Sequence, residues 1–526
     1  MASTDKPTGE HELDSDGSTA NSAQSATEAS SATAHQSDRA RWLALYVLCA
    51  GMLMIVLDVT IVNVALPSVQ DDLGFSQTDL AWVVNAYLVP FGGLLLLAGR
   101  LGDLLGQRRI FLIGLVVFTG ASLLCALAQS PEWLVSARFV QGVGGALTSA
   151  VILGMVVTMF PERTEQAKAI GIYTFVAVAG GSIGLLAGGA LTEAISWNWI
   201  FLINLPIGVA VGLFALRLVE SRPGLGFDQG ADIPGAVLIT SGLMLGVFTI
   251  LGIDEQGWVS AQTIGLGIIS IGLVAAFIAR QARISNPLMP LRMFKSRNVA
   301  GANSVQALLV VGMFGMFFLG ALYMQGVLGY SPLDVGLAFL PVTLVMAVMT
   351  FRFTAILNIR FGARATLIPG IVLVGAGLLL FARTPVDASY VTDILPPMIL
   401  FGFGAGLAFP SLMALAMSAA TPSEAGLASG LVNTSVQVGG AIGLAVLATL
   451  AAGRTDRLLD AGESVASALN GGYHLAYLIG VVLVGIALVV AVTVLRDDVP
   501  AAAPAEAESD GGVPAYGEAP AVSEAS

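Results

Sequence analysis

Residues 81–109 read AWVVNAYLVPFGGLLLLAGRLGDLLGQRR. The stretch 80–100 is apolar and carries no charge before Arg100, and about 20 such residues allow an α-helix to cross a bilayer. A short, glycine-rich turn with Asp103 and two arginines follows. The sequence therefore predicts a membrane-spanning helix that ends in a tight charged turn.

Working outward from this segment, similar apolar stretches recur along the chain. Of its 526 residues, 56% are hydrophobic and only 11% are charged, whereas soluble proteins carry about 25% charged residues. This composition excludes a soluble enzyme and predicts an all-α polytopic membrane protein. We expect fourteen spans, at residues 42–66, 80–100, 109–129, 133–158, 168–193, 199–219, 232–253, 261–280, 299–325, 334–356, 365–383, 390–418, 425–452 and 472–495.

The net charge of −12 comes mainly from the two ends of the chain. Residues 1–38 and 497–526 hold seven acids each, so the remainder is close to neutral. Neither end contains an apolar run, and residues 1–38 do not form a signal peptide. We expect disordered cytoplasmic tails at 1–40 and 497–526.

Basic residues orient the predicted spans, because positive charges gather in cytoplasmic loops. With an even number of spans, the bias places both termini in the cytoplasm and the protein in the cytoplasmic (inner) membrane. The basic residues on that side are Arg100, Arg108, Arg109, Arg163, Lys168, Arg217, Arg222, Arg280, Arg283, Arg292, Lys295, Arg297, Arg360 and Arg364. The loops on the other side hold only Arg383, Arg454 and Arg457.

An internal repeat divides the chain. Span 4 carries Gly142 and Gly144, and span 12, eight spans later, carries Gly402 and Gly404. The charged loop after span 2 has a weaker echo after span 10. Repeats of this kind are typical of transporters built from two related helical bundles. We expect a six-helix bundle at 41–219, a central helix pair at 220–285 and a second six-helix bundle at 286–496.

Two ionisable residues lie clearly inside the spans, namely Asp58 in span 1 and Arg138 in span 4. Charges at bilayer depth are costly and usually mark a proton or substrate pathway. Their distances from the outer ends of their spans place them at similar depths, so they are able to interact. An acid that moves between an apolar site and a guanidinium is able to bind and release a proton. A fixed ion pair that braces two helices is the alternative.

Neutral polar residues within the spans are candidates for a central substrate cavity, although hydrogen bonds between helices explain each of them equally well. They are Asn63, Asn85, Tyr87, Gln141, Gln306, Tyr323, Gln325, Asn433 and Gln437. The C-terminal half has no counterpart of Asp58 or Arg138, so proton handling is assigned to the first bundle. No phosphate-binding loop is present, and we expect no ATP, nucleic acid, cofactor or metal.

Four segments resemble the major facilitator superfamily, and specifically its fourteen-span drug–proton antiporter branch, over residues 41–496. Residues 57–67 (LDVTIVNVALP) are similar to the span-1 motif, and residues 287–297 to the segment before span 9. The resemblance implies the major facilitator fold, proton coupling by Asp58 and Arg138, and a span-4 motif of Arg138, Gln141 and Gly142. It also implies a cytoplasmic gate motif, formed by Gly99, Asp103, Gly106, Arg108 and Arg109.

The chain departs from that pattern in span 5 and at Asn198. The antiporter motif of span 5 normally has proline after its first glycine, whereas this chain has Leu185 between Gly184 and the pair Gly188–Gly189. A helix without that proline is stiffer. This departure affects the expected direction of substrate movement relative to proton movement. Asn198 stands where the family usually has arginine.

The resemblance predicts a monomeric, proton-coupled antiporter that exports lipophilic drugs or antibiotics by alternating access and is not an enzyme. Its partners would be a small lipophilic substrate, protons and the lipid bilayer. A narrow exporter of one endogenous metabolite or antibiotic is the first alternative. The second alternative is a receptor or scaffold that has kept the fold and lost transport.

Overall fold

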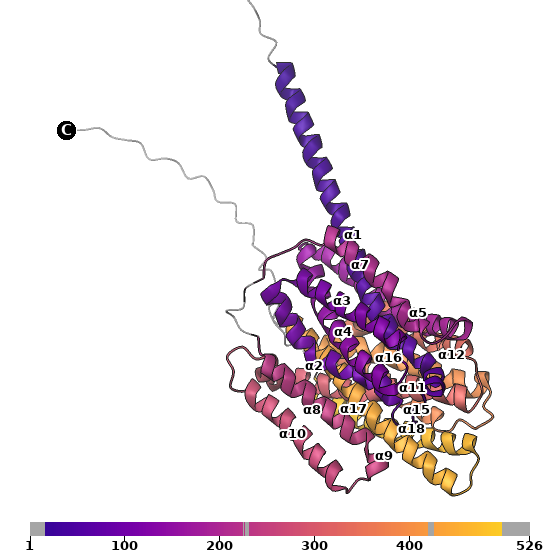
Figure 1. Cartoon of the computed structure of the whole chain (residues 1–526). Coiled ribbons are helices and arrows are strands. Elements are labelled where there is room, and N and C mark those ends of the chain that lie inside the picture. The colour runs from indigo at the N-terminus through magenta and orange to yellow at the C-terminus, as the bar shows by residue number, and fades with distance from the viewer. Residues whose placement is uncertain (1–15, 225, 227–230, 419–424, 497–526) are drawn as a thin grey trace, which may run out of the picture.

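The computed structural model describes residues 16–224, 226, 231–418 and 425–496. Within these ranges the ordered elements are helices, with no strand (Figure 1). The α-helices of the first half are α1 (Asp16–Leu73), α2 (Ala81–Leu105), α3 (Gln107–Ala126), α4 (Pro131–Met159), α5 (Arg163–Ala194), α6 (Trp199–Leu202), α7 (Asn204–Leu218), α8 (Ile233–Leu251) and α9 (Ile253–Gln256). Those of the second half are α10 (Ala261–Gln281), α11 (Arg297–Gly326), α12 (Pro332–Ala338), α13 (Leu340–Val348), α14 (Ala355–Phe361), α15 (Ala363–Phe381), α16 (Leu395–Met417), α17 (Ala425–Asp460) and α18 (Val465–Thr493). Short 3-10 and π segments complete them, as η2 (Leu291–Lys295), η3 (Met349–Thr354) and η4 (Tyr390–Ile394).

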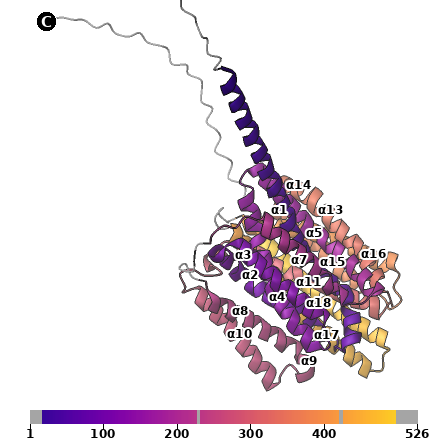
Figure 2. The ribbon, with the colours of Figure 1, turned by 45° about the horizontal axis from the view of Figure 1, so that its top comes forward.

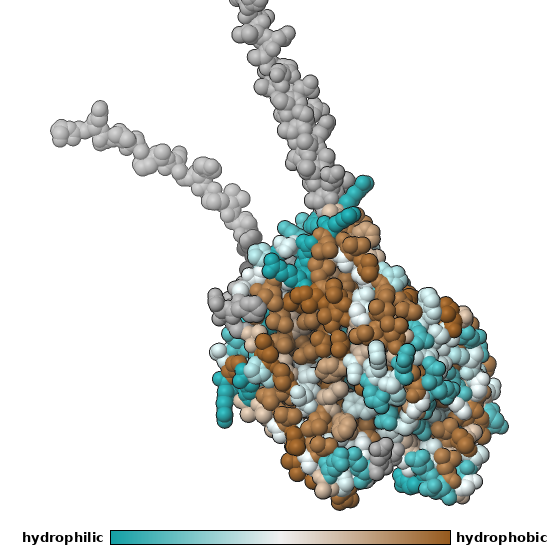
Figure 3. Space-filling view, viewed as in Figure 1, coloured by the Kyte–Doolittle hydropathy of each residue, from teal (hydrophilic) through white to brown (hydrophobic). Residues whose placement is uncertain are grey.

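The prediction of fourteen spans is confirmed, since fourteen helical stretches of the described chain are long and apolar enough to cross a membrane. Several spans are interrupted: α6 and α7 form the sixth, and α12, α13, η3 and α14 form the tenth. Large apolar side chains such as Val116 and Ile271 remain exposed, as expected for a surface in contact with lipid. Figure 3 shows a broad apolar area on one face. Hydrophilic residues lie above it, where α1 leaves the bundle, and below it, at the opposite end of the molecule.

The first helix differs from its prediction at both ends. It begins at Asp16 and continues to Leu73, whereas the span was expected at 42–66 and the preceding residues were expected to lack secondary structure. The added segment after Gly17 contains no proline or glycine and has several alanines, which favour helix. It projects away from the helices of the membrane body (Figure 1). Residues 1–15 and the acidic C-terminal segment 497–526 lie outside the described residues.

The helices form two six-helix bundles. In the first, α3 packs on α4, α2 on α4, and α1 on α5 and α7. In the second, α11, α15, α16, α17 and α18 pack on one another, and the tenth span joins them through the packing of α13 on α16. Glycines allow the close approach within the first bundle: a Cβ atom at Gly142 would overlap the Tyr87 carbonyl oxygen, and one at Gly144 would overlap the backbone of α3.

The central pair, α8 and α10, lies beside the bundles in both ribbon views (Figures 1 and 2). α8 contacts α2 of the first bundle and α17 of the second, while α10 packs mainly on α8. Asp232, at the start of α8, joins the two helices by accepting hydrogen bonds from Arg280 Nε and Gln281 Nε2, both at 2.6 Å. Burial opposes ionisation of this carboxyl, but these bonds and one from the Gly235 N–H lower its pKa overall.

We call the end of the membrane body that carries most of the arginines, including Arg108, Arg109 and Arg217, the basic end. The N-terminal extension of α1 leaves the bundle here (Figure 1). The other end, where α1 finishes at Leu73 and α5 at Ala194, we call the far end.

Candidate functional site: a buried ion pair in the first bundle

The site is centred on an ion pair between α1 and α4. Arg138 Nη1 lies 2.5 Å from Asp58 Oδ2, and both side chains are almost completely buried, at 1% and 0% exposure. The structure thus brings together the two ionisable residues that the sequence singled out. Their mutual attraction offsets a desolvation penalty of several kcal/mol per ion, provided that further hydrogen bonds satisfy the remaining polar atoms.

Arg138 is held on several sides. Its Nε donates to the Val83 carbonyl oxygen of α2 at 2.9 Å, and its Nη1 also donates to Gln141 Oε1 at 2.7 Å. The guanidinium lies over the ring of Tyr87, 4.5 Å from the centroid, and 5.6 Å from that of Phe201. A cation over an aromatic face is stabilised by the ring quadrupole, so the arginine keeps favourable contacts besides its carboxylate.

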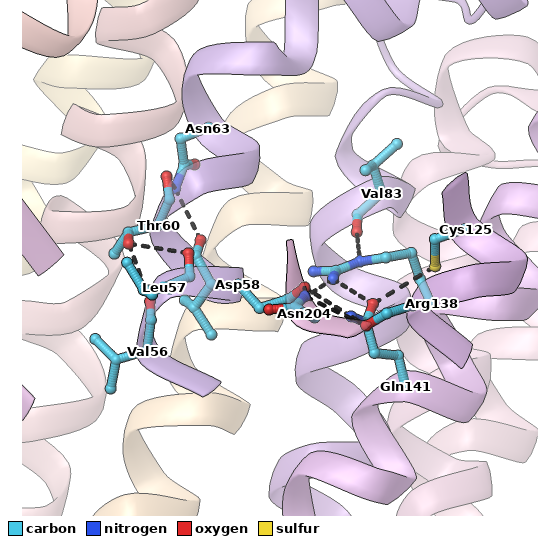
Figure 4. Close-up of polar contacts among 12 residues, drawn as sticks. Val56, Leu57, Asp58, Thr60, Asn63, Val83, Cys125, Arg138, Gln141 and Asn204 are labelled. Carbon is cyan, nitrogen blue, oxygen red and sulfur yellow. Dashed lines mark hydrogen bonds and ion pairs between the residues drawn. The ribbon is translucent and has the colours of Figure 1, made fainter. Parts of the chain in front are cut away.

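The second carboxylate oxygen of Asp58 is bound by two amides (Figure 4). Gln141 Nε2 donates to Oδ1 at 2.6 Å, and Asn204 Nδ2 donates to the same atom at 3.1 Å. Both amides also donate to Ser122 Oγ, at 2.8 and 3.3 Å. The Cys125 thiol lies 3.5 Å from Gln141 Oε1. Helices α1, α4 and α7 therefore meet at one carboxylate, which accepts hydrogen bonds from Arg138, Gln141 and Asn204, while Ser122 of α3 binds the two amides.

Asn204 contributes to this cluster from the start of α7. Pro206 has no N–H to donate to the carbonyl of the residue four positions earlier, Leu202. The helix is divided at Ile203, where α6 ends and α7 begins with Asn204. The backbone at Ile203 keeps right-handed helical angles (φ −58°, ψ −27°), so α6 and α7 continue as one span, and the Asn204 amide points toward Asp58 of α1 and Ser122 of α3.

Sequence reasoning did not identify Asn204 or Ser122 as site residues. Asn204 belongs to residues 201–208 (FLINLPIG), and a polar residue beside a proline within an apolar span was the available signal. Ser122 is a single hydroxyl in an apolar helix, which carries little information because serines are common at helix contacts in membranes.

The other first-bundle residues predicted to line a cavity are buried, and of these Tyr87 contacts Arg138 through its ring. The Asn63 amide donates to the carbonyl oxygens of Val59 and Thr60 in its own helix. Asn85 has no hydrogen bond from either side-chain polar atom within the described structure, and the Tyr87 hydroxyl likewise has none.

The predicted cavity residues of the second bundle are dispersed. Gln306 is buried, Tyr323 donates to the Pro385 carbonyl oxygen at 2.6 Å, and Gln437 packs against Gly92 of α2. Asn433 is exposed on α17. These positions do not converge on the ion pair.

The predicted gate motif lies at the basic end, where it holds the segment that follows α7. Asp103 and Arg109 are exposed, and Arg108 donates to the Leu216 carbonyl oxygen. Gly106 has a φ of 97°, which favours glycine, and a Cβ there would lie 2.7 Å from the Arg222 carbonyl oxygen. A cavity of about 230 Å³ lies among these loops. Gly99, by contrast, has open space around it.

The span-5 glycines lie toward the far end. A Cβ at Gly184 would overlap the Thr60 hydroxyl, and one at Gly188 would lie 2.6 Å from the Ile61 carbonyl oxygen, so both permit close packing of α5 on α1. Gly189 instead faces α12 of the second bundle, where a Cβ would lie 2.6 Å from the Pro332 carbonyl oxygen.

Two hydrogen bonds reinforce this contact between the bundles. Glu193 Oε2 accepts from the Leu333 N–H at 3.1 Å, and Gln325 Nε2 donates to the Val64 carbonyl oxygen at 2.8 Å. All four residues lie toward the far end of their helices. The two bundles are therefore joined there by backbone-to-backbone packing and by polar bonds.

Known proteins similar to this chain are named for antibiotic or drug resistance and for antibiotic export. The chain is 38% identical over 467 residues to the puromycin resistance protein pur8 of Streptomyces alboniger, covering 87% of this chain and 92% of that protein. It is 39% identical over 411 residues to the cephamycin export protein CmcT of Amycolatopsis lactamdurans, covering 77% and 84%. The multidrug resistance protein Stp of Mycobacterium tuberculosis is 33% identical over 418 residues, covering 79% and 76%.

Among solved structures, a bacterial homologue of the human lysosomal transporter Spinster, in an inward-facing and unoccupied conformation, has a TM-score of 0.60. It is 17% identical and covers 87% of this chain and 98% of its own, so the likeness concerns the fold. The sequence model of the Major Facilitator Superfamily matches residues 48–444. With fourteen membrane helices, two six-helix bundles and these relatives, the chain belongs to the major facilitator superfamily.

Proposed function

We propose that this protein is a monomeric antiporter that exports a lipophilic drug or antibiotic in exchange for protons. The observation that carries the proposal is the buried Asp58–Arg138 pair, a titratable acid held at bilayer depth by a cation. Relatives named for resistance to puromycin and to several drugs support the substrate class.

The basic end is assigned to the cytoplasm by the bias of its arginines, which places both termini there and the protein in the cytoplasmic membrane. Export then means movement of substrate from the basic end to the far end. In the structure the bundles are joined at the far end through Gly189, Glu193 and Gln325. Release of substrate outward requires these contacts to part.

Asp58 is the proposed proton carrier. When it binds a proton from outside, its charge is lost and the attraction to Arg138 falls. Arg138 keeps the Val83 carbonyl, Gln141 and the Tyr87 ring as partners, so its own burial remains compensated. When the proton is released inward, the ion pair forms again. One proton crossing about 100 mV supplies about 2.3 kcal/mol, enough for a roughly fiftyfold gradient of a neutral solute.

The gate motif is proposed to act at the other end of the same cycle. Asp103 is exposed in this arrangement, and we propose that it pairs with basic groups when the cytoplasmic side closes. Gly106 forms the turn between α2 and α3, Arg108 and Arg109 follow it at the start of α3, and Gly99 lies within α2.

The test is substrate-driven proton movement in proteoliposomes that contain a pH-sensitive dye. Puromycin, ethidium and a set of neutral polyketides serve as substrates. Native protein is compared with Asp58→Asn and with Asp79→Asn, a matched change at an exposed acid that caps the turn before α2. Coupled flux that is lost only in Asp58→Asn supports the proposal, and flux that survives in Asp58→Asn refutes the role of this acid.

A narrow exporter of one metabolite or antibiotic is a second candidate, favoured by the relative named for cephamycin export. The same panel separates the two, because a narrow exporter responds to a single chemical class. A receptor or scaffold would show no substrate-linked flux with any compound.

A further inference from the structure

Around Asp58, the Asn204 carbonyl oxygen and the Tyr87 hydroxyl are buried polar groups without a hydrogen-bond partner among the described residues. Gln141 uses both ends of its amide, since its carbonyl oxygen accepts from Arg138 and its NH₂ donates to Asp58 and Ser122. Asn204 uses only its NH₂ group, which donates to Asp58 and Ser122. Its carbonyl oxygen is buried and accepts no hydrogen bond from the described residues. An unsatisfied buried acceptor is uncommon and calls for an explanation.

The amide orientation follows from the chemistry of its neighbours. Turning Asn204 over would set its carbonyl oxygen against an ionised carboxylate, and two acceptors repel each other. Asp58 in its ionised form therefore selects the observed orientation. A protonated Asp58 instead carries an O–H donor and needs an acceptor.

We propose that Asn204 is a positioning residue that follows the protonation state of Asp58. Its NH₂ binds the ionised carboxylate, and its carbonyl oxygen accepts the O–H of the protonated acid after the amide turns. Gln141 is not suited to this role, because turning it would also break its bond to Arg138. Turning Asn204 releases its NH₂ group from Ser122, but its carbonyl oxygen has no partner to lose, so fewer hydrogen bonds break than when Gln141 turns. The inference rests on the proton-coupled function proposed above.

The surroundings of Asp58 make the effect measurable. The titratable or charged groups that face it are Arg138 from α4, Tyr87 from α2 and Cys125 from α3. Of these, only Arg138 is charged at neutral pH. A change at Asn204 leaves all three in place, so a shift in the titration of Asp58 reports the lost amide.

The experiment measures protonation of Asp58 directly, with the proton as the only ligand. Infrared spectra of the full-length protein in detergent are recorded against pH, and the Asp58 carboxyl band is assigned by its absence in Asp58→Asn. Asn204→Leu removes the donor and the acceptor together. A hydrogen bond to a charged group is worth about twice a bond between neutral groups. The variant therefore destabilises ionised Asp58 more than protonated Asp58. The midpoint should rise by about one pH unit.

Asn204→Asp tests the acceptor half and keeps the size of the side chain. A carboxylate at this position repels ionised Asp58 and accepts the O–H of protonated Asp58. The midpoint should therefore rise further than in Asn204→Leu. The matched control is Asn198→Leu, which removes an amide of the same segment that donates to the Ala126 carbonyl oxygen. This control should leave the midpoint in place.

The outcomes separate the two proposals. If Asp58 shows no titration in the native protein, the proton-coupled function fails. If Asp58 titrates and Asn204→Leu and Asn204→Asp both keep the native midpoint, Asn204 has a merely structural role and this inference fails alone. Equal shifts in the two variants would overturn the acceptor role.

Discussion

Removing Arg138 should expose how strongly the ion pair couples α1 to α4. In Arg138→Met the Asp58 carboxylate stays buried and loses its cation, together with the contact at 2.5 Å. Leaving one charge of a buried pair uncompensated costs about 3–5 kcal/mol. Asp58→Asn/Arg138→Met removes both charges, so it should be more stable than the sum of the single changes predicts, with a coupling energy of about 3 kcal/mol.

The assay is denaturant unfolding in detergent, followed by the fluorescence of the six tryptophans. Asp232 and Arg280 provide the matched control pair, because their atoms are 2.6 Å apart while Arg280 is 37% exposed. Asp232 is itself buried, but solvent at Arg280 screens this pair, so its coupling energy should be smaller than that of Asp58–Arg138. Equal coupling energies for the two pairs would refute the claim that burial makes the Asp58–Arg138 interaction strong.

Three further outcomes follow from the packing. Gly142→Val should separate α2 from α4 and lower the free energy of unfolding by at least about 2 kcal/mol, as measured by the same assay; Gly99→Val, in open space, should have little packing cost. Gln325→Leu removes the bond to Val64 and should favour parting of the far end, measured as faster alkylation of a cysteine introduced there; an unchanged rate would contradict this. Because the pKa of Asp232 is lowered in the folded state, its stabilisation should be fully present above about pH 4, the usual aspartate value. It should be lost as pH falls through the lower folded value, and Asp232→Asn should abolish this dependence in thermal unfolding.

The sequence predicted the spans well because lipid imposes a strong and simple requirement on them. Each span needs about 20 apolar residues with satisfied backbone groups, and this pattern is visible without knowledge of packing. Asp58 and Arg138 were identifiable for the same reason, since charge is rare within such segments. The helical start of α1 at Asp16 was missed because the absence of apolar residues does not prevent a helix.

Neutral polar residues were harder to interpret. Asn204 and Gln325 are both amide side chains within apolar stretches of the sequence. Asn204 donates to Asp58, whereas Gln325 donates to the backbone of α1 at the far end. Periodicity within one helix does not reveal which neighbouring helix its polar residue meets. The direction of the Asn204 amide follows from the packing of the sixth span against α1 and α3, which the sequence of one helix does not show.

The position of α8 has a kinetic consequence. This helix touches α2 and α17 together, and Thr449 of α17 donates to the Ile250 carbonyl oxygen at 3.1 Å. When one bundle rotates relative to the other, at least one of them must therefore slide along α8 or break its contacts with this helix. The free energy of those contacts enters the activation barrier between conformations. Substitutions on the surface of α8 should therefore change the turnover rate without touching the proton site.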